Sequence, residues 1–553
     1  MLINVKKNLF YIIILLLLSL AAVWPFFKPG FFSFHDNTQV VRVQQMAEAL
    51  RDGQLPVRWV RDLGYGYGYP IFNFYAPLPY YFAGLLVLLG CSSIVAVKLM
   101  MAVPLVLSGV AMFFWAKSNW GRLGGLVAGL FYVYAPYKAA DCYVRGAVGE
   151  LWAMMFLPLV FLGLQSLFNQ SKARPVLLAV ALAGVILSHN ILALLTALVL
   201  VIILLVAFFL RLLATRKQLI RLLFAIALAL GLSAFFWLPA ITEASLTKVQ
   251  TLSQGANHYS QHFVYLDQLW NSLWGFAGSA PGRLDGMSFK IGKLHLLAAL
   301  AGLGLLWFKK NLKRLKKQTF VLAILPLVIS VVMMLQISQP VWELVSPLVF
   351  VQYPWRFLVF TILTASFLTG AVFVPQPTKQ YTWLKWTVAA GLIVGLLFLN
   401  LKFFKAQAHF QAQSEDYTNR ENIIWETSKI SDEYLPKNFK VPDEISAIKQ
   451  DLVVADKPDT KIEILSHKSN LINIKVNSPG SAELTVYLTY FPDWQVFLDQ
   501  QFHSFKTKDG FIVIYVPEGE HLVTLQLKDS SIRKLANKIS LFSLAVLFGV
   551  KYW

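Results

Sequence analysis

Cysteine and charged residues are scarce in this sequence. Only Cys91 and Cys142 are present among 553 residues, so the sequence implies no disulfide framework. Charged residues make up 14% of the chain and hydrophobic residues 57%, which is too apolar for a soluble enzyme, and the chain is far too long for a single span. No internal repeat or low-complexity segment is evident. We therefore expect a polytopic α-helical membrane protein.

Acidic residues are also few: 29 Asp and Glu stand against 49 Lys and Arg, which gives a net charge of +20. The basic residues lie between apolar runs rather than along one face, so we expect no nucleic-acid partner. Before residue 405, the loops that carry most basic residues contain no acid. Such loops mark the cytoplasmic side. The sequence thus predicts a multi-pass protein of the cell membrane with a cytoplasmic N-terminus.

Long apolar runs recur along the chain. The first, residues 9–27, follows Lys6 and Lys7 and is interpreted as a retained anchor rather than a signal peptide, because it is long and lacks a clear cleavage site. The run at 79–90 is short and predicts a re-entrant or interfacial half-helix, or a thirteenth crossing if it spans fully. About twelve crossings are predicted, with the later ones at 92–116, 122–137, 147–168, 174–190, 191–211, 219–239, 293–308, 319–337, 355–375, 383–404 and 536–553.

The composition changes between residues 405 and 535, where most of the acids lie. Period-two alternation at 461–465, 471–476 and 511–516 predicts strands, and Asp509-Gly510 is typical of a turn. We expect an extracytoplasmic β-sandwich at 405–535, between a transmembrane domain at 1–404 and a last transmembrane helix at 536–553.

Asp36 follows the first span and precedes a helical pattern over 38–51. Apolar residues recur there at helical spacing while polar residues lie elsewhere, as in a helix that lies along the membrane surface. Asp36, Asn37 or Thr38 could simply cap this helix, or Asp36 could be a catalytic carboxylate in the outer loop 28–78. The same loop contains Tyr69 in a glycine-flexed aromatic stretch, which suits either sugar binding or an interfacial belt.

Charged residues at the edges of other predicted spans are further candidates. Arg145 and Arg356 each enter a span from the outer side, where a guanidinium could hold a lipid phosphate with paired hydrogen bonds. The plain alternatives are a salt bridge of Arg145 with Glu150 or Asp141 and a snorkelling Arg356. His189 and Glu243 lie at outer helix ends. His258 and His262 have the spacing of a metal face but lack a nearby acid.

Several of these segments resemble known families. The first span, the acid in the outer loop and the helix after it are similar to the GT-C superfamily of membrane glycosyltransferases. A bacterial membrane family labelled 6-pyruvoyl-tetrahydropterin synthase-related is similar over nearly the whole chain. The motifs that carry the likeness are Phe34-His35-Asp36, Pro56-Val57-Arg58-Trp59, Gly68-Tyr69-Pro70, Tyr143-Val144-Arg145-Gly146, Ser188-His189, Gln352-Tyr353-Pro354-Trp355-Arg356 and Glu433-Tyr434-Leu435-Pro436.

The GT-C resemblance implies transfer of a sugar from a polyprenyl-phosphate donor to an extracytoplasmic acceptor, with inversion. The superfamily's loop acid corresponds to Asp36. Two adjacent acids often stand there, but this chain has His35-Asp36, which leaves the use of a divalent metal open. The resemblance to the outer β-domain of lipoteichoic acid glycosylating proteins rests on Tyr490-Phe491-Pro492-Asp493-Trp494. The pterin synthase label implies no activity, because the zinc-binding histidines and reactive cysteine of that enzyme have no counterpart arrangement in this sequence.

The leading hypothesis is therefore a glycosyltransferase that acts on membrane lipids and a lipid-linked sugar. Asp36 would be its base or a metal ligand, and Arg145 and Arg356 would hold the lipid phosphate. The substrate-binding candidates of second rank are His35, Tyr69, Glu150, His189 and Glu243. The sequence leaves two alternatives open: a transporter or flippase of lipid-linked sugars, and a non-catalytic envelope assembly protein.

Overall fold

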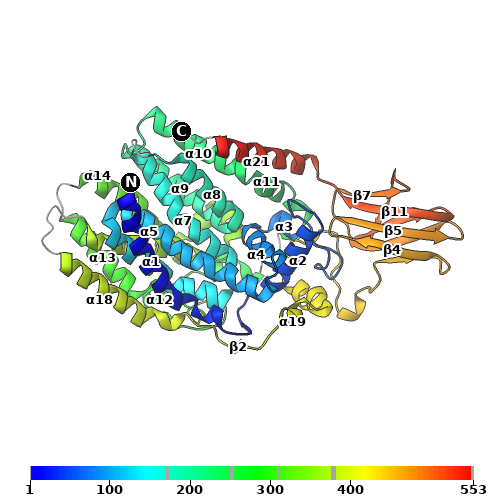
Figure 1. Ribbon diagram of the computed structural model, residues 1–553, viewed down its shortest axis with the longest axis horizontal. Coiled ribbons are helices and arrows are strands. Elements are labelled where there is room, and N and C mark those ends of the chain that lie inside the picture. Colours follow the sequence, from blue (N-terminus) through cyan, green and yellow to red (C-terminus); the bar gives the residue numbers. More distant parts are fainter. Residues whose placement is uncertain (1, 170–172, 250–254, 309–311, 375–381, 550–553) are drawn as a thin grey trace.

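A bundle of long helices carries two β-sheets at one end in the computed structural model (Figure 1). The structure describes residues 2–169, 173–249, 255–308, 312–374 and 382–549. Helix α1 begins, and α21 ends, at the end of the bundle that faces away from the sheets. The loops between α1 and α5 lie at the opposite end, next to the sheets.

The helices follow the apolar runs of the sequence, because a helix satisfies its own backbone hydrogen bonds in an apolar setting. Their bounds are α1 (Leu2–Val23), α2 (Gln39–Arg51), α3 (Ile71–Phe74), α4 (Leu78–Leu88), α5 (Ser93–Val133), α6 (Pro136–Ala140), α7 (Val148–Phe168), α8 (Pro175–Ser188), α9 (Asn190–Phe209), α10 (Arg216–Leu232), α11 (Ala234–Thr242), α12 (Leu266–Asn271), α13 (Lys293–Trp307), α14 (Lys313–Thr319), α15 (Leu325–Met334), α16 (Gln339–Leu344), α17 (Leu358–Thr369), α18 (Thr382–Asn400), α19 (Ser414–Thr418), α20 (Ser428–Ile430) and α21 (Ser531–Gly549).

Seven helices of the described residues are long and apolar enough to cross a membrane, or eight if α10 and α11, which meet at a bend of 73°, form one span. Every predicted span contains a helix, although residue 375 of one span and residues 550–553 of the last one lie outside the described residues. The prediction of a polytopic α-helical membrane protein is confirmed. Helix α4 has 11 residues, about 16 Å of helix, which is too short for a full crossing.

Helix α5 is a hairpin rather than one straight helix. Its backbone leaves the helical conformation at Gly121, with φ 77° and ψ 179°. The two halves pack closely, since a Cβ added at Gly129 would lie 2.8 Å from the carbonyl oxygen of Gly109. The residues before and after the hairpin, Ser92 and Tyr134, therefore lie at the same end of the bundle.

Helix α2 was expected along a membrane surface, but the protein itself covers both of its faces. Its polar side chains Arg42 and Gln45 are as buried as its apolar ones, at 3% and 1% exposure. Arg42 bonds Ser431 at 2.8 Å, and Gln45 bonds Asp62 at 2.9 Å. The predicted helix is confirmed, whereas the surface position is wrong because these polar groups find partners inside the protein.

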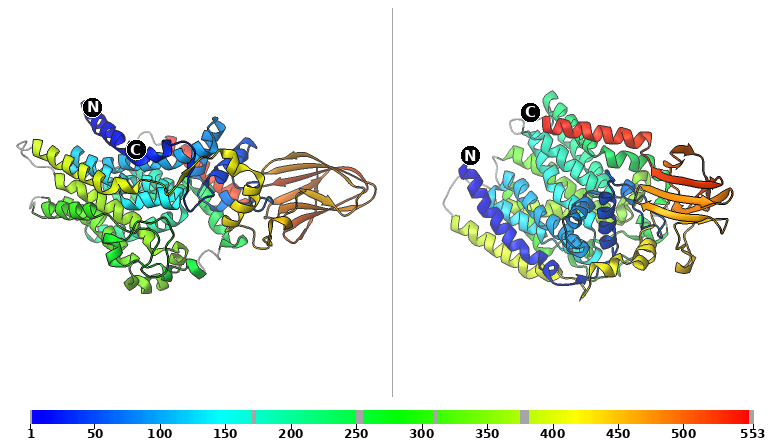
Figure 2. Two further views of the ribbon diagram at one scale, coloured as in Figure 1. Left: turned by 90° about the horizontal axis from the view of Figure 1, so that it is seen from below. Right: turned by 45° about the vertical axis from the view of Figure 1, so that its right-hand side comes forward.

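The β-domain is a sandwich of two antiparallel sheets (Figure 2). One has the strand order β4-β5-β11-β7-β8 and the other β3-β6-β10-β9. Alternate residues of β5 and β6, among them Ile474 and Leu484, are fully buried between the sheets. The predicted strands are confirmed. A separate two-stranded sheet of β1 and β2 joins the loop after α1 to the segment after α18. The strands are β1 (Phe31–Phe32), β2 (His409–Phe410), β3 (Val453–Ala455), β4 (Lys461–His467), β5 (Leu471–Ser478), β6 (Ala482–Thr489), β7 (Trp494–Leu498), β8 (Gln501–His503), β9 (Lys506–Lys508), β10 (Phe511–Val516) and β11 (Gly519–Leu527).

Candidate functional site

The loop that carries Asp36 is fastened to the turn before α7. Backbone amides of His35 and Asp36 donate to the carbonyls of Val144 and Arg145 at 2.9 and 3.0 Å. The turn closes at Gly146, whose φ of +70° favours glycine. A Cβ there would lie 2.2 Å from the Phe34 ring. This close approach brings two segments together that are far apart in the sequence.

The carboxylate of Asp36 is half-buried and is held by side chains. Its two oxygens accept hydrogen bonds from Thr38 Oγ1 at 2.8 Å and Gln39 Nε2 at 2.7 Å. Gln39 is oriented in turn by the Tyr80 hydroxyl, which donates to its amide oxygen at 2.7 Å. Thr38 directly precedes α2, and among the described residues no side chain caps the start of this helix, so the plain helix-cap interpretation is wrong. The carboxylate is positioned and still reaches the surface.

Arg42 and Glu433 form a buried ion pair near Asp36, with 3.3 Å between Arg42 Nη2 and Glu433 Oε1. The Arg42 guanidinium also lies 4.7 Å from the centre of the Tyr75 ring. Burial raises the pKa of Glu433, and Arg42 opposes that shift. Burial likewise raises the pKa of Tyr75 to about 12. Sequence reasoning missed Arg42, because its helical spacing placed it on a solvated face.

A second cluster joins three of the predicted site residues. Glu150 is fully buried, and its Oε1 lies 2.6 Å from Arg145 Nη2 and 3.3 Å from Arg356 Nε. Arg145 also pairs with Asp141, and its guanidinium lies 4.6 Å from the centre of the Trp355 ring. The salt-bridge alternative for Arg145 is confirmed. Arg356 is bonded to Val351 and Glu150 rather than snorkelling freely.

His189 borders this cluster. Its Nδ1 accepts the Leu192 amide at 3.1 Å and so caps α9. A Cβ added at Gly149 would lie 2.9 Å from the His189 ring, which shows how closely the imidazole packs beside Glu150. The structure therefore brings Asp36, Arg145, Glu150, His189 and Arg356 into two adjoining clusters.

The other predicted residues have different surroundings. Glu243 accepts from Arg533 Nη2 at 2.9 Å and from Asn73 at 2.7 Å, so it ties the end of α11 to α21. Tyr69 is fully buried, and its hydroxyl accepts the Tyr434 amide at 3.0 Å. The exposed His35 bonds the Phe276 carbonyl at 2.8 Å. In the described part of the chain none of the three contacts the Asp36 carboxylate.

A metal site does not form from the described residues. They contain no group of three His, Cys, Asp or Glu placed to hold an ion. His258 and His262 bond Ser260 and Ser279 instead. Both oxygens of Asp36 accept hydrogen bonds from neighbouring side chains. Among the residues that the structure describes, no set therefore fits a bound metal.

Comparisons with known proteins place this chain within a family. A family model described as 6-pyruvoyl-tetrahydropterin synthase related domain, membrane protein, matches residues 72–406. An uncharacterised protein of Lactococcus lactis subsp. cremoris (strain MG1363) is 28% identical over 288 residues, which cover 50% of this chain and 45% of that protein. The chain thus spans less than half the length of this relative.

Two solved structures are also similar. The arabinofuranosyltransferase AftD from Mycobacteria gives a TM-score of 0.46 at 15% identity, over 74% of this chain and 27% of that one. ArnT from Cupriavidus metallidurans, solved with undecaprenyl phosphate, gives 0.33 at 13% identity, over 67% and 77%. Because the family model matches more than half of its residues, the chain belongs to the membrane protein family of the 6-pyruvoyl-tetrahydropterin synthase related domain.

Proposed function

We propose that this protein is a GT-C-type inverting glycosyltransferase, which moves a sugar from a polyprenyl-phosphate donor to an acceptor on the extracytoplasmic side. The observation that carries the proposal is the backbone hydrogen bond between Asp36 and Arg145. It places the candidate base beside the turn that carries the candidate phosphate ligand. The order of first span, loop acid and following helix is also what the GT-C resemblance implies.

Asp36 would accept the proton of the acceptor hydroxyl. General-base catalysis needs a carboxylate within hydrogen-bond reach of that proton, and the half-buried Asp36 is held on one side and accessible on the other. As the acceptor oxygen bonds to the anomeric carbon, the bond from that carbon to the phosphate oxygen breaks. Its electron pair leaves with the lipid phosphate, and the proton passes to Asp36.

Arg145 and Arg356 would stabilise the departing phosphate. Among the described residues, the hydrogen bonds of Arg145 come from Nη1 and Nη2 and those of Arg356 from Nη1, so Nε of Arg145 and Nη2 of Arg356 keep a donor for a ligand. Glu150 holds both guanidinium groups, at 2.6 and 3.3 Å, and would fix their geometry before the substrate binds. Preorganised donors of this kind stabilise charge that develops in a transition state.

In this proposal the transmembrane domain at 1–404 holds the reaction site. The extracytoplasmic domain at 405–535 guides the acceptor to it, and the last helix at 536–553 anchors that domain in the membrane. The β-sandwich is next to the site because Glu433 and Tyr434, from the segment before its first strand, contact Arg42 and Tyr69.

The test is to incubate the purified protein with radiolabelled polyprenyl-phosphate sugars and to measure the release of free lipid phosphate. A glycosyltransferase releases it only when an acceptor is present. Movement of the intact donor across a proteoliposome membrane, without release, would instead support the transporter. Absence of both activities would favour an assembly role.

A further inference from the structure

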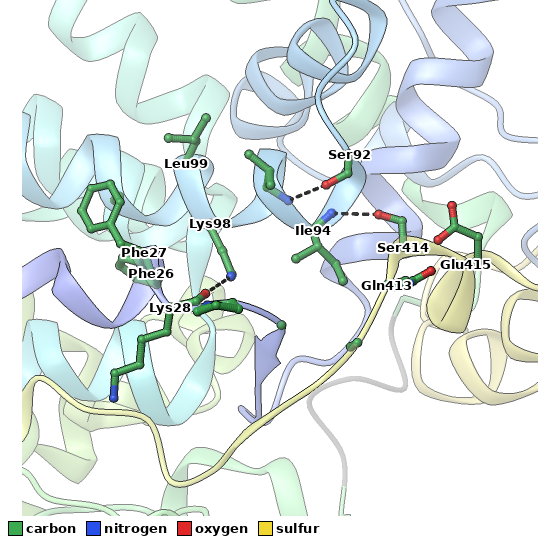
Figure 3. A pocket seen from close by; sticks show the side chains of 15 residues that line it. Phe26, Phe27, Lys28, Ser92, Ile94, Lys98, Leu99, Gln413, Ser414 and Glu415 are labelled. Carbon is green, nitrogen blue, oxygen red and sulfur yellow. Dashed lines mark hydrogen bonds between the residues drawn. The ribbon is translucent and has the colours of Figure 1, made fainter.

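A pocket of about 630 Å³ lies beside the end of the first span (Figure 3). Three segments line it: residues 26–30 after α1, residues 92–102 at the start of α5, and residues 412–415. Its volume is in the range of small-molecule sites. In the described residues, no side chain that lines it bonds Asp36, Arg145 or Arg356, so this pocket is separate from the site above.

Lys98 is the buried cation of this pocket. It is 8% exposed, and its ammonium donates one hydrogen bond, to the Lys28 carbonyl at 2.7 Å. An ammonium has three donors, and among the described residues Lys98 has no carboxylate partner. Charged groups at membrane edges are costly and generally have a partner or a function. Two donors of Lys98 are thus available to a ligand.

The lining of the pocket is divided by polarity. Figure 3 shows Phe26, Phe27 and Leu99 on one side of Lys98, and Ser414 and Glu415 on the other. The apolar side continues the surface of α1, which is one of the helices able to cross a membrane. A ligand with an apolar chain and a polar head matches this division.

The charge of the lining favours an anionic head. Lys28 and Lys98 outnumber the single carboxylate of the lining residues, Glu415. The excess of one positive charge matches a head that carries one negative charge. The hydroxyl of Ser414 accepts a hydrogen bond from the Ile94 amide at 3.3 Å, so it holds the segment 412–415 against α5.

We propose that this pocket binds a phosphate-bearing lipid with a single negative charge, of the phosphatidylglycerol class. The phosphate accepts the two free donors of Lys98, and the lipid chain lies along Phe26, Phe27 and Leu99. Since the ligand touches the end of α1, the start of α5 and the segment 412–415, it fastens the part of the chain that runs from α18 to the β-domain. The inference does not depend on the proposed transferase activity.

The experiment measures the affinity of the full-length protein in detergent for short-chain phosphatidylglycerol, short-chain phosphatidylcholine and inorganic phosphate. Lys98→Met removes the ammonium, and Lys98→Arg keeps the charge. Lys117→Met is the matched control, because Lys117 lies on the same hairpin but outside the pocket. Ala102→Leu narrows the apolar wall without changing any charge, and keeps the test decisive if Lys98→Met does not fold.

Phosphatidylglycerol should bind the wild type and Lys117→Met about tenfold or more tightly than phosphatidylcholine, as expected for hydrogen bonds to a charged group. Lys98→Met should lose this preference and Lys98→Arg should keep it. Ala102→Leu should bind both lipids more weakly than the wild type, because the larger side chain narrows the space for the lipid chain. Inorganic phosphate should compete weakly, since it lacks the chain. Equal preference in wild type and Lys98→Met, or binding of inorganic phosphate as tight as that of the lipid, would overturn the proposal.

Discussion

The backbone amide of Asp36 donates a hydrogen bond to the carbonyl of Arg145 across 3.0 Å. This bond links the loop after the first span to the turn that enters α7. It makes the position of the carboxylate depend on the same turn that positions the arginine cluster. A change in the turn should therefore disturb both halves of the proposed site.

Asp36→Asn should lower sugar transfer by about 100-fold or more, because the amide cannot accept the acceptor proton. The fold should be retained, since an amide oxygen still accepts from Thr38 or Gln39. Transfer is measured as release of lipid phosphate, and folding as the thermal midpoint. Asp62→Asn is the control, because the Asp62 carboxylate also accepts a hydrogen bond from a glutamine amide, Gln45 Nε2, at 2.9 Å. Full activity of folded Asp36→Asn would refute the catalytic assignment.

Arg356→Lys should weaken donor binding by about tenfold, because an ammonium lacks the planar fork that pairs with phosphate. Arg145→Lys should act in the same direction and also disturb the pair with Glu150. Donor affinity is measured in nanodiscs of one composition. Arg533→Lys is the control, because Arg533 pairs with Glu243 instead. If all three variants bound the donor as well as wild type does, neither Arg145 nor Arg356 would hold the phosphate.

Gly146→Ala should destabilise the protein by at least about 1 kcal/mol more than Gly53→Ala does. Both glycines have a positive φ, +70° at Gly146 and +87° at Gly53. A Cβ added at Gly146 would lie 2.2 Å from Phe34, whereas a Cβ added at Gly53 would have no atom within 4 Å. Transfer activity should fall with Gly146→Ala as the turn moves away from Asp36. The measurements are the thermal midpoint and the rate of transfer. Equal thermal midpoints for the two variants would show that the close packing of Gly146 on Phe34 contributes nothing to the stability of the protein.

Cysteines introduced at Asn37 and Lys461, both exposed, should react with an impermeant reagent in intact cells if the positive loops are cytoplasmic. Both cysteines are introduced into the Cys91→Ser variant, because the half-buried Cys91 could itself react with the reagent. A cysteine at Ser118, on the turn of the α5 hairpin, should react only after lysis. The reverse pattern would invert the predicted orientation and place the proposed site on the cytoplasmic side.

The sequence alone determined the membrane class, the positions of the helices and the strands of the β-domain. These features depend on local properties, namely the length of an apolar run and the alternation of side chains along a strand. It also identified Asp36, Arg145 and Arg356 as unusual, because charges at the edge of a span are costly.

Only the tertiary structure decided which charges meet. Glu150 binds Arg145, which precedes it in the same turn, and Arg356, which is more than 200 residues away. Glu243 also lies near the end of a predicted span, but it binds Arg533 of α21. Arg42 lies on an amphipathic pattern that is typical of a surface helix, yet it is buried against Glu433. Such pairs form when packing brings distant segments together and removes water from both groups. Periodicity and spacing describe one segment at a time, so they contain no information about the partner.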